Sequence, residues 1–114
     1  YTDHYYQGFV EQYDGSWEEA ADNYLKGYRK ARKAGHELGM DILLGMELRF
    51  DGTIEDYLVY GFDDNFIYSN PYLNRLTLAS FRDVIKGEDI LIFQAHPFRT
   101  NIKAADPRLL DGVE

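Results

Sequence analysis

The chain has 114 residues, 45% of them hydrophobic, a formal net charge of −8 and no cysteine. This length suits one compact domain, and the apolar content excludes wholesale disorder. A negative surface without a lysine and arginine stripe argues against non-specific nucleic-acid binding. Without cysteine there are no disulfides and no thiolate metal sites, so any metal must be held by imidazole and oxygen ligands.

No apolar run approaches the roughly 20 residues that span a bilayer, and no signal peptide is recognisable. We therefore expect a cytoplasmic protein that does not bind membranes. The chain begins at Tyr1 and ends at Glu114 within an apolar stretch. We expect both ends to continue in a longer protein.

The first predicted element is a helix from about Trp17 to Leu38. Ser16 and Glu19 have the spacing of a capping box, and Gly39 is a suitable stop. One apolar stripe at helical spacing comprises Trp17, Ala20, Ala21, Tyr24, Tyr28, Ala31 and Leu38. The pattern predicts a helix that packs one face on a core.

Two strands are predicted next. The segment Asp41–Phe50 begins with a continuous apolar run, as expected for a strand buried on both faces. Asp51-Gly52 signals a turn, and Tyr57–Phe62 reads as a second strand. The two strands are close enough in sequence to form a hairpin.

Further elements alternate in type. Asn70-Pro71 indicates a helix start, and Thr77–Lys86 predicts a short helix with Thr77 as its cap. Ile90–Ala95 predicts a third strand buried on both faces, residues 101–108 read as a loop, and Leu109–Glu114 enters a fourth strand. Strands separated by helices predict an α/β sheet or barrel.

Three possible metal ligands fall at comparable places in this layout. His4 precedes the first helix, Glu47 lies late in the first clear strand, and His96 directly follows the third strand. Loops at the carboxyl ends of parallel strands gather on one side, where ligands bind. Two imidazoles and a carboxylate suit zinc, manganese or iron. The alternative for each histidine is a surface residue or a core residue whose hydrogen bonds are satisfied. For Glu47 the alternative is that strand alternation points it at solvent, beside Arg49.

Other polar residues are weaker candidates. Arg99 has the geometry to form a fork to a phosphate oxygen, or is an exposed loop arginine. Asp63 and Asp64 end the second strand and either face the same site or form a solvated turn. Asp3 is a candidate to orient a neighbouring imidazole. His36 lies among polar residues near a helix end, and we assign it no function.

At these residues the chain resembles the PHP (polymerase and histidinol phosphatase) family. The matching stretches, in order, are Thr2-Asp3-His4, Gly45-Met46-Glu47, Tyr60-Gly61-Phe62, Gln94-Ala95-His96-Pro97-Phe98-Arg99 and Asp111-Gly112-Val113-Glu114. Each motif is short, and together they span nearly the whole chain. The resemblance implies part of a distorted, seven-stranded, TIM-like β/α barrel with two or three divalent metal ions (Zn, Mn or Fe) at the carboxyl ends of the strands.

The resemblance also implies roles. His4, Glu47 and His96 would be metal ligands, with Glu47 bridging two ions, and Arg99 would bind the phosphate of a small phosphorylated substrate. Some members place a further histidine ligand where this chain has Asp63. The implied activity is that of a phosphoesterase, a hydrolase in which metal-activated water attacks the phosphate ester.

Two family motifs are missing. The family opens with His-x-His and carries Asp-x-His near its end, whereas none of the three histidines here has either arrangement. We expect truncation at both ends, so that residues 1–114 form a partial PHP domain from the middle of the barrel. Alone, this piece is expected to bind metal weakly, to have little or no activity, and to self-associate through exposed strand edges.

Two alternatives remain open. The first is a degenerate PHP-like domain that has lost its metals and serves as a structural or interaction module. The second is a metal-dependent amidohydrolase or deacetylase on a related barrel.

Overall fold

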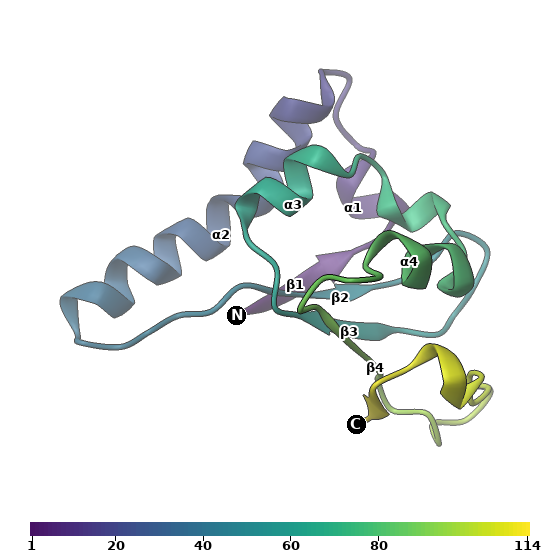
Figure 1. Cartoon of the computed structure of the whole chain (residues 1–114). Helices are drawn as coiled ribbons and strands as arrows, with labels where there is room; N and C mark the ends of the chain where they lie inside the picture. The colour runs from purple at the N-terminus through teal and green to yellow at the C-terminus, as the bar shows by residue number, and fades with distance from the viewer.

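A mixed five-stranded sheet in the order β1-β2-β3-β4-β5 organises the molecule, and the computed structural model describes all residues 1–114 (Figure 1). The strands are β1 (Thr2–Tyr5), β2 (Gly45–Leu48), β3 (Tyr57–Tyr60), β4 (Leu91–Gln94) and β5 (Gly112–Val113). The α-helices are α1 (Gln7–Val10), α2 (Trp17–Glu37), α3 (Asp64–Ser69) and α4 (Leu78–Val84). Short 3-10 turns occupy Leu73–Arg75 and Pro107–Leu109. The predicted α/β class is confirmed.

Strand direction decides which residues share an end of the sheet. β1 is parallel to β2 and β4 is parallel to β5, whereas β3 is antiparallel to both of its neighbours. We call the end where β1, β2 and β4 finish the carboxyl end, and the opposite end the amino end. Because β3 alone runs the other way, it begins at the carboxyl end.

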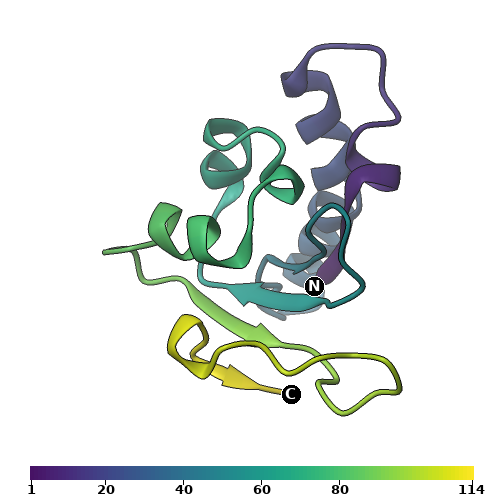
Figure 2. The ribbon, with the colours of Figure 1, turned by 90° about the vertical axis from the view of Figure 1, so that its right-hand side faces the viewer.

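The helices gather on one side of the sheet (Figure 1). Met46, Val59 and Ile92 pair across β2, β3 and β4 and are fully buried on this side. Their neighbours along the strands point to the other face because side chains alternate along a strand. On that face Tyr60 and Leu91 remain 38% and 48% exposed. We call it the open face, and Figure 2 shows β5 at the sheet edge beyond β4.

Helix α2 follows its predicted bounds closely. The Ser16 hydroxyl accepts the Glu19 N–H at 3.3 Å, without a return bond from the Glu19 carboxylate. The reciprocal capping box is found in α4 instead, between Thr77 and Ser80. The predicted inclusion of Leu38 in the buried stripe is wrong, because the helix ends before it and the side chain is 75% exposed.

The strands are shorter than their apolar runs suggested. The segment 41–44 has no strand partner, because β3 stops at Tyr60 opposite Gly45 and the chain turns away at Gly61, which has a φ of +98°. The prediction that the third strand is buried on both faces is also wrong, because Leu91 lies on the open face. The predicted hairpin of the first two strands is confirmed by the β2–β3 pairing.

The predicted helix start at Asn70-Pro71 is wrong. Helix α3 lies before it, where the Asp63 carboxylate accepts the Phe66 N–H at 3.2 Å and begins the helix. Pro71 then follows the helix end, a common position because proline cannot continue a helix. The cap residue Asp63, and not Asn70-Pro71, therefore sets where α3 begins.

Candidate metal centre

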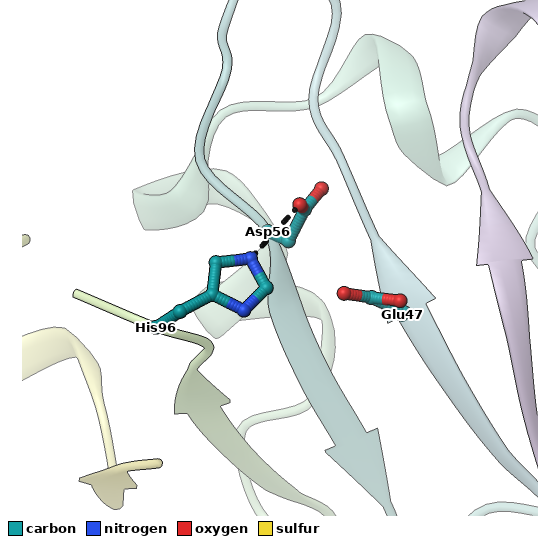
Figure 3. A group of neighbouring side chains, drawn as sticks. All are labelled: Glu47, Asp56 and His96. Carbon is teal, nitrogen blue, oxygen red and sulfur yellow. Dashed lines mark hydrogen bonds and ion pairs between the residues drawn. The ribbon is translucent and has the colours of Figure 1, made fainter. Parts of the chain in front are cut away.

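Three side chains from separate segments converge at the carboxyl end of the sheet. One ligand atom each from Glu47, Asp56 and His96 lies within 4.8 Å of the others (Figure 3). His4 adjoins this group, with its Nδ1 atom 3.1 Å from Oε2 of Glu47. We call Glu47, Asp56, His96 and His4 the acidic–histidine cluster.

Strand pairing explains this convergence. His4 pairs with Glu47 in the β1–β2 register, so both side chains lie on the open face. Asp56 directly precedes β3, which starts beside the end of β2. The Ala95 N–H donates to the Asp56 carbonyl at 2.9 Å, which places the following residue, His96, beside the same carboxylate.

The backbone of His96 adopts a left-handed conformation with a φ of +36°. This region is uncommon for residues other than glycine and costs about 1–3 kcal/mol. Its carbonyl accepts the Arg99 N–H at 3.0 Å, which closes a turn directly after β4. Such strain clusters at functional sites, where surrounding structure compensates for it. Here the turn holds the imidazole toward Asp56.

Asp56 is the most buried member of the cluster, with 4% of the residue exposed. Its two oxygens face Nε and Nη2 of Arg49 at 2.7 and 2.8 Å, and Nε2 of His96 lies at 3.3 Å. Burial raises the pKa of this carboxyl, but hydrogen bonds from Arg49 and His96 outweigh burial and hold the pKa below its ordinary value. Asp56 is therefore an ionised oxygen donor at neutral pH.

The distances fit neighbouring ligands of a divalent ion. Two donors each about 2.1 Å from one ion are roughly 3.4 Å apart at a tetrahedral angle. The His96–Asp56 separation of 3.3 Å and the His4–Glu47 separation of 3.1 Å are close to this value. The overall spread of 4.8 Å requires a small inward movement of Glu47, which has 21% of its side chain exposed. The donor set of imidazole nitrogens and carboxylate oxygens suits zinc, manganese or iron.

The structure brings the three predicted ligands, His4, Glu47 and His96, to one end of the sheet and adds Asp56, which the sequence interpretation missed. The available signal was the predicted hairpin itself. In an antiparallel pair, the residue that starts the second strand lies beside the end of the first. Asp56 immediately before Tyr57 meets that condition.

Three other predicted residues are not part of the acidic–histidine cluster. Asp63 follows the last residue of β3, so it lies at the amino end, where its carboxylate caps α3. Asp3 accepts the Tyr1 hydroxyl and the backbone N–H of His4, and strand alternation puts its side chain on the face opposite the imidazole. Arg99 is exposed and forms no ion pair. The predicted placement of Asp63 and the orienting role of Asp3 are therefore wrong.

Comparison with protein-family models gives no match, and no curated protein is significantly similar to the chain. None of the helices has the length and apolar content that crossing a bilayer requires.

Proposed function

We propose that Glu47, Asp56 and His96 bind a divalent cation in a domain that hydrolyses phosphate esters. The observation that carries the metal site is the meeting of these three donors from separate segments within 4.8 Å. Asp56 supplies a carboxylate whose pKa, despite burial, is held below its ordinary value by hydrogen bonds from Arg49 and His96, so it is an ionised donor for a cation.

The arrangement of His4 supports a second ion. Glu47 lies between His4 on one side and the Asp56–His96 pair on the other. Glu47 would therefore be the residue shared by two ions. Divalent ions bound there would supply Lewis acidity and an activated water for attack on phosphorus. The cluster residues would hold the ions at the open face, and Arg49 fixes the Asp56 carboxylate.

The choice of phosphate esters rests on the resemblance of five ordered motifs to the PHP family. The fold is compatible with part of a distorted β/α barrel, because helices lie on one face and the cluster lies on the other. In such a barrel the open face would be the interior, and the free edges of β1 and β5 would pair with further strands. The antiparallel β3 is a departure from a regular β/α barrel.

Calorimetric titration with Mn²⁺ and Zn²⁺ tests the metal site. Wild-type chain is expected to bind, and Glu47→Gln or His96→Ala is expected to lower the affinity by at least tenfold. His36→Ala is the matched control, because His36 is an exposed histidine of α2 outside the cluster. Binding that survives both cluster substitutions, or none in the wild type, would contradict the proposal.

A substrate panel tests the reaction class separately. Sugar phosphates, nucleotides and a simple aryl phosphate are compared with amides at high protein concentration and saturating Mn²⁺. Slow phosphate-ester hydrolysis that disappears in Glu47→Gln is the expected result. Metal-dependent amide hydrolysis in its place would refute the phosphoesterase proposal and leave the metal site standing.

A further inference from the structure

Arg49 is fixed beside the acidic–histidine cluster with one nitrogen free. Its Nε and Nη2 atoms bind the two oxygens of Asp56 at 2.7 and 2.8 Å, and Nη1 has no protein acceptor. The side chain is 40% exposed. Arg49 lies two residues after Glu47, so both side chains project toward the same face. The guanidinium thus presents a free donor next to the candidate metal ligands.

Tyr6 holds the guanidinium from a second direction. The Arg49 guanidinium carbon lies 6.0 Å from the Tyr6 ring centroid, within the range of a cation–π contact. The same tyrosine ring packs edge-on against His4 at 6.2 Å. Arg49 and Tyr6 both line a hollow of about 170 Å³ formed with residues 7–8 and 50–52. A small ligand group therefore has space beside Arg49.

We propose that Arg49 is the anion-binding residue of this site and that it recognises an oxyanion of the phosphate-monoester class. The inference rests on the proposed function, because it needs a cation in the cluster. Glu47 and Asp56 carry two negative charges against one on Arg49, so they repel a free oxyanion. With a divalent cation bound, the oxyanion gains the cation on one side and the Nη1 donors of Arg49 on the other.

Arg49 is better prepared for this role than Arg99, to which the family resemblance assigns phosphate. Arg99 is exposed and has no ion pair, so ordering its side chain on a ligand costs conformational entropy. Arg49 is already held by Asp56 and Tyr6. A preorganised planar fork loses less freedom when it binds. Arg49 therefore determines specificity for an oxyanion, and Arg99 does not.

The test uses the full chain, Mn²⁺ and inorganic phosphate as the probe. Mn²⁺ affinity is measured by calorimetry, and phosphate binding by the broadening of its ³¹P resonance at equal Mn²⁺ occupancy. Arg49→Lys keeps the positive charge beside Asp56 and removes the fork. Because Arg49 also holds the Asp56 carboxylate, we expect this variant to lose some Mn²⁺ affinity, and to lose phosphate affinity by a further factor of about ten at equal Mn²⁺ occupancy. Arg99→Lys is the matched control and is expected to bind both as wild type does.

Each outcome supports or contradicts the role of Arg49 in binding an oxyanion. Wild-type phosphate affinity in Arg49→Lys, or an equal loss in Arg99→Lys, overturns the inference. So does a parallel loss of Mn²⁺ and phosphate in Arg49→Lys, because Arg49 would then only position Asp56. If the wild-type chain binds Mn²⁺ but not phosphate, this inference is overturned and the proposed metal site stands. A wild-type chain that binds no Mn²⁺ refutes the metal site and this inference with it. Thermal unfolding of each variant checks that it is folded.

Discussion

The two ends of the sheet contrast in how they use aspartate. At the carboxyl end Asp56 precedes β3, is buried, and contacts Arg49 and His96. At the amino end Asp63 and Asp64 follow the same strand, where Asp63 caps α3 and Asp64 pairs with Arg29 at 3.3 Å. Aspartates on either side of one short strand thus have different roles, because the strand separates them across the sheet.

The hollows at the two ends make the same contrast. A hollow of about 750 Å³ at the amino end is lined by Tyr28, Arg32, His36, Asp63 and Asp64 among others. It is the larger hollow, yet its histidine and acidic residues are not within coordination distance of one another as a group of three. The smaller hollow is lined by Arg49, which binds Asp56 of the cluster. Donor geometry, and not the volume of a hollow, is therefore the reason for placing the candidate metal centre at the carboxyl end.

Adding metal should give the largest difference between aspartate variants at the two ends of the sheet. A cation at about 100 times its Kd stabilises the folded state by about 2.7 kcal/mol. For a domain of this size the melting temperature rises by roughly 10 °C. We expect this rise in wild type and in Asp63→Asn, and its loss in Asp56→Asn, measured by thermal denaturation with Mn²⁺. Equal rises in melting temperature in both variants would contradict the assignment of the metal site to the carboxyl end.

Removing the buried carboxylate without metal should have the next largest effect. Asp56→Ala leaves Arg49 and His96 without their shared acceptor, and we expect the free energy of unfolding to fall by about 2 kcal/mol. Asp64→Ala removes a more exposed ion pair and should cost less than about 1 kcal/mol. Urea denaturation measures both. A larger loss in Asp64→Ala would contradict the greater contribution expected from the buried Asp56.

Asp63 should act through its cap alone. Asp63→Ala removes the acceptor for the Phe66 N–H and should lower the free energy of unfolding by about 1 kcal/mol. Asp63→Asn retains a good cap and should change stability little. Calorimetric Mn²⁺ titration of Asp63→Ala is expected to match wild type. A loss of Mn²⁺ binding there would return Asp63 to the site.

The smallest expected difference concerns pH. Burial raises the pKa of Asp56, whereas the hydrogen bonds from Arg49 and His96 lower it. The net effect is a pKa below the ordinary value. A folded-state pKa below the unfolded value gives stability that is present above about pH 4 and lost as pH falls through the folded pKa. Asp111, whose pKa is lowered by Arg82, acts with the same sign. Unfolding measured from pH 6 to 2 should therefore show a shallower acid slope in Asp56→Asn than in wild type, without vanishing.

The sequence correctly predicted where helices α2 and α4 begin, because these starts depend on contacts within a few residues. Ser16 and Thr77 both cap the helices predicted after them, since a cap and an apolar stripe act within a few residues. The strand bounds were harder to predict. The apolar run 41–44 lacks a strand partner, and a strand requires a neighbour that the sequence does not specify.

The candidate site divides in the same way. By itself, the sequence determined the candidate donors, namely His4, Glu47 and His96 with no cysteine, and the element that each one borders. Only the tertiary structure decided that Asp56 joins them and that Asp63 does not. The reason is the antiparallel direction of β3: an acidic residue before the strand and one after it have similar sequence signals, but the strand separates them across the sheet.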